Sequence, residues 1–168
     1  SFPILSFLTF FPLVGVIFIL LRRGSDEVVE RSSKNISILV SVINFIVSLF
    51  LWSKFDPANA GFQFVEETPW IKNFVSYKMG VDGISIFLVL LTTFISPLCI
   101  FAAINSLKKR IKEFLIAILI MQTFMIGVFC ALDLFLFFLF FEGGLIPMFL
   151  IIGIWGGERR VYSALKFF

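Results

Sequence analysis

The sequence predicts an all-α, polytopic membrane protein, and three observations support that prediction. Of the 168 residues, 60% are hydrophobic and only 15% are charged, and the mean hydropathy is +1.05. Soluble domains average about 45–50% apolar and about 25% charged residues. The charges are also segregated between apolar runs that are long enough to cross the ~30 Å hydrocarbon core of a bilayer. Lipid is therefore expected to surround most of this protein.

Five apolar runs are predicted to be transmembrane helices, because about 20 such residues cross the hydrocarbon core. Their expected boundaries are 1–21, 35–53, 83–107, 114–132 and 134–157. A sixth helix is expected over residues 161–168, and the chain stops there after barely two turns. An isolated two-turn stub is not a stable end for a membrane protein. The chain is therefore expected to be the first part of a longer protein, either truncated or split between two chains.

The segment between the second and third runs, residues 54–82, is expected to lie outside the bilayer. Residues 61–68 alternate in part between apolar and polar side chains, and the β-rich stretch Phe74–Tyr77 follows. This pattern favours a short β-hairpin. The alternative is an irregular loop that Trp70 anchors at the membrane interface.

The basic residues fall mainly on one side of the predicted helices. Ten follow the first, third or fifth run, whereas three lie between residues 54 and 82. The ten are Arg22, Arg23, Arg31, Lys34, Lys108, Lys109, Arg110, Lys112, Arg159 and Arg160. The positive-inside rule then places the N-terminus outside and the three basic loops in the cytoplasm or matrix. Because each cluster adjoins a membrane span, nucleic acid is not expected as a partner.

The composition also excludes several kinds of chemistry. The chain has two cysteines and no histidine, and no Cys-x-x-Cys motif or Cys/His cluster is present. Ordinary zinc, haem and iron–sulfur sites draw on several such ligands, so no metal site is expected. No glycine-rich nucleotide-binding motif occurs either. Any redox cofactor that drives this protein is therefore expected in another chain.

Glu142 is the principal candidate for chemistry. It lies nine residues after Asp133, about 13.5 Å along a helix at 1.5 Å per residue, and so near the middle of the membrane. A carboxylate at that depth costs a few kcal/mol unless it is neutralised, paired or hydrated. Burial favours the neutral acid, whereas a nearby cation favours the carboxylate. A carboxyl group between these two effects can take up and release a proton when its surroundings change. The structural alternative is a protonated glutamic acid that is hydrogen-bonded to a neighbouring helix.

Three neighbours of Glu142 fit the functional interpretation. Gly143 and Gly144 remove side-chain bulk, which permits close helix packing or water. Pro147 cannot donate to the Gly143 carbonyl and so frees an acceptor.

Lys166 is a second candidate for chemistry. It lies roughly 9 Å from the inner surface, where it either snorkels to that surface or acts as a relay partner.

Several other residues have more ordinary interpretations. Asp82 precedes the third helix and is expected to be its N-cap, and Asp133 is expected at the interface. Cys99 and Cys130 are expected to serve as small apolar residues in the membrane. Pro12 and Pro97 are expected to kink their helices, whereas Asn44, Gln122 and Thr123 either join a polar network or simply hold helices together.

The fifth run also resembles a known family. Residues Phe140–Leu150, FFEGGLIPMFL, followed by Ile151–Gly157, IIGIWGG, are similar to the signature of subunit 4 of respiratory complex I, NADH:ubiquinone oxidoreductase. Subunit 4 belongs to the antiporter-like family. Supporting similarities are FQFVE at 62–66, PWI at 69–71, GVDGIS at 80–85 and ALKFF at 164–168.

The resemblance implies a proton-translocating membrane-arm subunit with an outer-face hairpin and no prosthetic group of its own. Residues 1–168 would form the N-terminal part of the antiporter-like membrane domain. Glu142 matches the family's essential glutamate, which is coupled to a lysine on a later helix. Lys166 aligns with a position that is less central to the family mechanism. The later helices are absent from this chain, so it is expected to need them to complete a proton path.

The resemblance also implies where the partners lie. NADH, FMN, iron–sulfur clusters and ubiquinone are expected in other subunits of the complex, and the expected partners are the remaining part of subunit 4, neighbouring antiporter-like subunits and membrane lipids. The 25 phenylalanines reflect A+T-rich codons and favour the mitochondrial inner membrane over a bacterial cell membrane. Two rival functions remain open: a subunit of a multi-subunit sodium/proton antiporter, and a purely structural piece in which Glu142 is a fixed hydrogen-bond donor.

Overall fold

The structure is a computed structural model that describes residues 2–71, 75–107 and 109–155. It confirms a helical bundle with five helices that are long and apolar enough to cross a membrane in this part of the chain. The elements are α1 (Ile4–Leu21), α2 (Asp26–Ser53), β1 (Gln63–Ile71), β2 (Val75–Val81), α3 (Gly83–Ser106), α4 (Ile111–Cys130) and α5 (Leu134–Trp155). The expected sixth helix, 161–168, lies outside the described residues.

The helix α2 begins at Asp26, nine residues before the apolar run that predicted it. Its added turns form because Ser25 caps them, with Oγ accepting from the Val28 amide at 3.4 Å. Ion pairs at i, i+4 spacing support the same turns, Glu27 with Arg31 at 3.7 Å and Glu30 with Lys34 at 3.2 Å. Arg31 and Lys34 are therefore helical, and so is Lys112, because α4 begins at Ile111; the expected placement of all three in loops is wrong.

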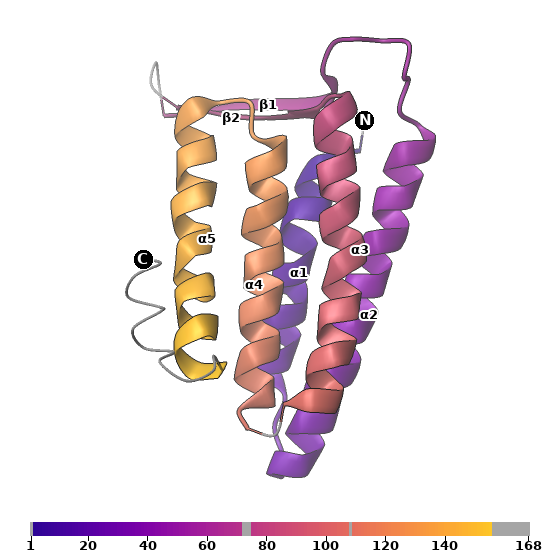
Figure 1. Ribbon diagram of the computed structural model, residues 1–168. Coiled ribbons are helices and arrows are strands. Elements are labelled where there is room, and N and C mark those ends of the chain that lie inside the picture. The colour runs from indigo at the N-terminus through magenta and orange to yellow at the C-terminus, as the bar shows by residue number, and fades with distance from the viewer. Residues whose placement is uncertain (1, 72–74, 108, 156–168) are drawn as a thin grey trace.

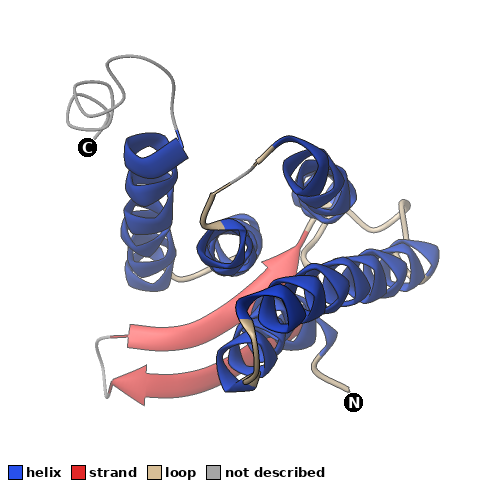
Figure 2. Cartoon of the chain, turned by 90° about the horizontal axis from the view of Figure 1, so that it is seen from below, coloured by secondary structure: helices blue, strands red, loops and turns tan. Residues whose placement is uncertain are grey.

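The five helices stand side by side, with the hairpin across one end (Figure 1). The helix α4 lies in the middle of the bundle and packs against α1, α2, α3 and α5, as the view along the helices also shows (Figure 2). By contrast, α5 packs mainly against α4. Half of the apolar window of α4 is buried, but only 17% of that of α5. One side of α5 is thus left uncovered by the described residues.

The expected β-hairpin is confirmed, so an irregular loop is the wrong alternative for this segment. The strands β1 and β2 are antiparallel, with Thr68 opposite Tyr77. The residues that follow α4 continue the pairing, because Met79 bridges Ala131 and the Leu132 amide donates to the Lys78 carbonyl at 2.8 Å. Met79 is fully buried in the core at the hairpin end of the bundle. The hairpin is therefore fixed to the bundle as part of its core.

The described basic loops lie at the end of the bundle opposite the hairpin (Figure 1). One loop joins α1 to α2 and contains Arg22 and Arg23, and another joins α3 to α4 and contains Lys109 and Arg110. The basic loops and the hairpin thus lie at opposite ends of the bundle, as the charge pattern predicts. Lys108, Arg159 and Arg160 lie outside the described residues.

Candidate functional site

Glu142 lies eight residues after Leu134, the first residue of α5, and about 12 Å along the helix at 1.5 Å per residue. Because α5 has 22 residues, this position is in its middle third. The Glu142 side chain is exposed on the bundle surface. Within the part of the chain that the structure describes, its carboxylate has neither a hydrogen-bond partner nor an ion-pair partner.

The exposure of Glu142 follows from which side of α5 packs on the bundle. The buried residues of α5 are Leu136, Phe140 and Pro147, which recur at helical spacing on one side. Glu142 is two positions beyond Phe140, roughly 200° around the helix axis at about 100° per residue. The carboxylate therefore points away from α4. Apart from Glu142, α5 is apolar on all sides, so its sequence contains no periodicity that marks the packed face.

Gly143 serves close packing between α5 and α4. A Cβ atom added there would lie 2.6 Å from Cε1 of Phe124 on α4, and one added at Gly144 would lie 3.3 Å from Cβ of Phe124. The same seam contains a second such contact, where a Cβ added at Gly127 would lie 2.5 Å from Cδ1 of Phe140. The sequence left two roles open for the glycines, close helix packing or space for water. At Gly143 the structure shows close packing.

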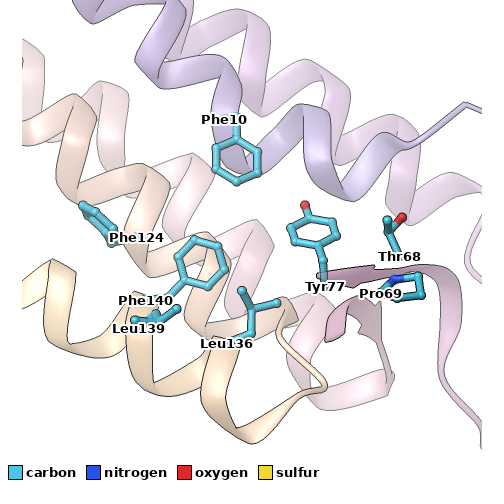
Figure 3. Close-up of a pocket in the computed structure, with 8 residues that line it drawn as sticks. All are labelled: Phe10, Thr68, Pro69, Tyr77, Phe124, Leu136, Leu139 and Phe140. Atoms are coloured by element: carbon cyan, nitrogen blue, oxygen red, sulfur yellow. The ribbon is translucent and has the colours of Figure 1, made fainter. Parts of the chain in front are cut away.

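Phe124 lines two pockets beside α5. The pocket nearer the hairpin has a volume of about 550 Å³ and is lined mainly by apolar side chains, with the rings of Phe10, Phe140 and Tyr77 facing it (Figure 3). The other pocket has a volume of about 280 Å³ and is lined in part by Gly143 and Pro147. The Phe124 ring, which both pockets share, lies directly against the glycine that follows Glu142.

A polar cluster joins the hairpin to the N-terminal end of α1. The Glu66 carboxylate accepts hydrogen bonds from the Leu5 amide at 2.8 Å, the Ser6 amide at 3.2 Å and the Ser6 hydroxyl. The Ser6 hydroxyl also lies 2.5 Å from the Tyr77 hydroxyl. Burial raises the pKa of Tyr77, opposed by the Ser6 hydrogen bond and reinforced by the nearby Glu66 charge. Sequence reasoning missed this cluster, because its α1 residues and its hairpin residues are 60 to 71 positions apart in the sequence.

A second group of polar side chains lies inside the bundle. The Asn44 amide donates to the Leu8 carbonyl at 3.0 Å, and the Ser48 and Thr93 hydroxyls are 2.7 Å apart. Gln122 and Thr123 are buried on α4. Of the three residues expected to join a polar network or to hold helices together, Asn44 links α2 to α1, whereas the Gln122 amide and the Thr123 hydroxyl have no hydrogen-bond partner among the described residues. The link from α2 to α3, between Ser48 and Thr93, was not expected from the sequence.

The expected N-cap at Asp82 is confirmed. Its carboxylate accepts from the Ser85 amide at 2.8 Å and the Ile84 amide at 3.0 Å, and Ser85 Oγ in turn accepts from the Asp82 amide at 2.8 Å. These hydrogen bonds, the Ser85 amide first, lower the pKa of Asp82. Asp133 has an unforeseen capping role, because its carboxylate accepts from the Leu136 amide at 3.0 Å at the start of α5.

Of the remaining candidates, the two cysteines lie within the described residues and Lys166 does not. Cys99 is exposed and Cys130 is buried, and neither is in a disulfide. In the described ranges, no group of three or more histidine, cysteine, aspartate or glutamate side chains is arranged to hold a metal ion. Lys166, the second candidate, lies outside the described residues.

Comparisons with known proteins give consistent matches over the whole chain. Residues 7–128 match the family model of the NADH-ubiquinone oxidoreductase chain 4 amino terminus, and residues 131–168 match that of the NADH:quinone oxidoreductase/Mrp antiporter transmembrane region. The chain is 53% identical over 166 residues to NADH-quinone oxidoreductase subunit M of Rhodobacter capsulatus, covering 98% of this chain and 32% of that protein. It is 45% identical to NADH-ubiquinone oxidoreductase chain 4 of Marchantia polymorpha, covering 98% and 33%.

The fold is likewise similar to a solved structure. Respiratory complex I from Thermus thermophilus with bound NADH contains a chain that superposes with a TM-score of 0.77 at 24% identity, over 96% of this chain and 31% of that one. The present chain thus spans about a third of the length of the curated relatives it matches.

Proposed function

The chain belongs to the family of NADH-ubiquinone oxidoreductase chain 4, and on that premise we propose that it is the N-terminal part of an antiporter-like membrane-arm subunit of respiratory complex I. NADH oxidation and quinone reduction take place in other subunits, which hold the redox cofactors. The role of this subunit is to move protons across the membrane through Glu142. The site is in the mitochondrial inner membrane or a bacterial cell membrane, since relatives come from both kinds of organism.

The observation that carries this proposal is the position of Glu142. It is the only charged residue of α5, it lies in the middle third of that helix, and its carboxylate has no partner within the described residues. A carboxylate at this depth needs a partner, a proton or water. The uncovered side of α5 supports a partner from outside the described residues. We place later helices of the full-length subunit on this side, with a lysine that pairs with Glu142 and with Lys166 as a further relay candidate.

The proposed mechanism is electrostatic. When a cation approaches Glu142, the carboxylate is favoured and a proton leaves, and when the cation withdraws, the neutral acid is favoured and a proton is taken up. Energy from electron transfer in other subunits moves the cation. The positive-inside rule places the basic loops on the matrix or cytoplasmic side, so protons enter there and leave on the hairpin side. The close contact of Gly143 with Phe124 keeps Glu142 at a fixed position on the α4–α5 pair while the charge beside it changes.

The test is a Glu142→Gln substitution in the full-length subunit, within the assembled complex in membrane vesicles. We expect a complex that assembles, as shown by native electrophoresis with an in-gel NADH dehydrogenase stain, but with proton translocation per NADH reduced. Glu142→Asp retains a titratable group and is expected to keep part of the activity. Glu113→Gln is the matched control, because Glu113 is an exposed carboxylate in the first turn of α4. Normal pumping by an assembled Glu142→Gln complex contradicts the proposal.

A second candidate function rests on the match of residues 131–168, because that family model covers Mrp antiporters as well as NADH:quinone oxidoreductases. A sodium/proton antiporter subunit exchanges ions without NADH. Sodium-dependent proton flux in vesicles that lack NADH, with the chain's peptides absent from the NADH-oxidising band of a native gel, is the result that favours this function over the first.

A further inference from the structure

An aromatic side chain lies one turn from Glu142 on the same side of α5. Phe138 precedes Glu142 by four residues, so the two are about 40° apart around the helix axis and about 6 Å apart along it. Phe138 is 56% exposed and Glu142 is also exposed, so both side chains point away from α4. The Phe138 ring is therefore beside the carboxylate, on the side of α5 that the described residues leave uncovered.

The neighbours of Glu142 differ toward the two ends of α5. Toward the hairpin, the residue one turn away is Phe138, whereas toward the basic loops it is Ile146, which is equally exposed at 56%. The face of a phenyl ring carries negative charge density and attracts cations, and an aliphatic side chain has no such face. A cation beside Glu142 is thus favoured on the hairpin side of the carboxylate.

The chain contains a cation at this spacing from a phenylalanine elsewhere. At the end of α2, the Nζ atom of Lys54 lies 5.7 Å from the centroid of the Phe50 ring, and Phe50 is four residues earlier in the sequence. This distance is within the range of about 6 Å that is typical of cation–π contacts. A cationic group at the level of Glu142 is therefore within reach of the Phe138 ring, because the same four residues separate these positions.

The described residues supply no cation for this site. The helices α1, α3 and α5 contain no lysine or arginine, and those of α2 and α4 lie toward the basic loops. The chain covers only 32% of the length of its Rhodobacter capsulatus relative, so most of a full-length subunit is available to supply a cation. A carboxylate in the middle of a membrane helix favours a cationic partner, because a buried charge needs to be paired.

We propose that Phe138 is a positioning residue for the cation that pairs with Glu142. An ammonium or guanidinium group from a later helix binds between the Glu142 carboxylate and the face of the Phe138 ring. This inference rests on the proposed function, because it concerns the same carboxylate, and it adds a residue that holds the cation. Away from water, a cation–π contact changes the occupancy of such a site about tenfold or more. Phe138 thus favours the paired state of Glu142, from which the proton has left.

Fluorinated phenylalanine at position 138 tests the proposal, because fluorine withdraws electrons from the ring face and leaves the ring nearly unchanged in shape. Analogues with one, two and three fluorine atoms are incorporated into the full-length subunit, and proton translocation per NADH is measured in membrane vesicles that contain the assembled complex. We expect a stepwise loss of proton translocation as fluorine atoms are added. Phe138→Leu removes the aromatic face and is expected to show the largest loss.

The same series at Phe137 is the matched control. Phe137 is also an exposed phenylalanine of α5, but it lies about 140° from Glu142 around the helix axis, so constant proton translocation is expected. Constant translocation across the series at position 138, or an equal decline at positions 137 and 138, overturns the proposal. If Phe138→Leu prevents assembly, the fluorinated proteins still decide, because they keep the ring.

Glu142→Gln, measured in the same vesicles, separates this inference from the proposed function. Loss of proton translocation in Glu142→Gln together with a constant series at position 138 contradicts only the role of Phe138. Normal translocation in an assembled Glu142→Gln complex contradicts both.

Discussion

The side-chain amide of Asn44 on α2 donates a 3.0 Å hydrogen bond to the backbone carbonyl of Leu8 on α1. Leu8 is four residues before Pro12, and a proline has no N–H to give to the carbonyl four residues earlier. Asn44 therefore supplies from another helix the hydrogen bond that the α1 backbone cannot make. In a membrane this matters more than in water, because no solvent is present to satisfy the carbonyl.

Replacing Asn44 by leucine is expected to destabilise the α1–α2 pair by about 1 kcal/mol, since the Leu8 carbonyl is left without a donor. Pro12→Ala restores a backbone N–H to α1 and is expected to make Asn44 dispensable. A double-mutant cycle on the thermal stability of the full-length subunit in detergent measures the coupling. Additive effects of the two substitutions would show that Asn44 and Pro12 are not linked through Leu8.

Replacing Glu66 by alanine is expected to loosen the N-terminal end of α1, because the Leu5 and Ser6 amides lose their acceptor. Loss of a capping acceptor costs about 0.5–2 kcal/mol. Faster amide hydrogen exchange in residues 4–7 is the predicted readout. Glu67→Ala is the matched control, since Glu67 is the adjacent, exposed carboxylate on β1. Equal exchange in the two variants would contradict the capping role of Glu66.

Gly143→Ala is expected to push α5 away from α4, because the new Cβ would lie 2.6 Å from the Phe124 ring. Overpacking of this kind costs about 1–3 kcal/mol. The smaller conflict at Gly144, with 3.3 Å to Phe124 Cβ, predicts a milder effect for Gly144→Ala. Thermal denaturation of the assembled complex is the measurement, and Phe124→Leu is expected to rescue Gly143→Ala in part. A Gly143→Ala complex as stable as the wild type rules out this packing argument.

The cap at Asp82 predicts an acid dependence of α3. Its pKa is lowered in the folded protein, first by the Ser85 amide, so the stabilisation is complete above the unfolded-state pKa of about 3.9 and is lost as the pH falls through the lower folded-state value. Exchange at the first turn of α3 should therefore accelerate only in strong acid. Asp82→Asn keeps a good N-cap without a titratable group and should not show this dependence. The same acid response in both proteins would exclude Asp82 as its source.

The sequence was sufficient to predict those parts of the fold that depend on local patterns. The five spans follow from apolar runs about as long as the bilayer core is thick, and the Asp82 cap follows from an aspartate placed directly before such a run. The start of α2 was missed because its first turns are charged and lie outside the apolar run. Hydropathy identifies the part of a helix that lipid surrounds, and it is insensitive to turns that extend into water.

The parts that the sequence could not predict depend on contacts between helices. Glu142 was recognisable as an isolated carboxylate, but the side of α5 on which it lies was not, since packed and uncovered faces of that helix are equally apolar. The link from Asn44 to Leu8 and the cap that Glu66 provides require two segments to meet. A single sequence contains no record of which segments are neighbours.

The cap of α1 also has a consequence for the order of events during synthesis. The helix α1 is synthesised before the hairpin, and the carboxylate that completes its N-terminal end follows 61 residues after the Leu5 amide. Before the two can meet, α2 must carry the chain back across the bilayer, so that Glu66 arrives on the side where Leu5 already lies. The bond forms only when both helices have inserted in opposite directions. The cap that Glu66 provides is therefore conditional on correct insertion of α1 and α2.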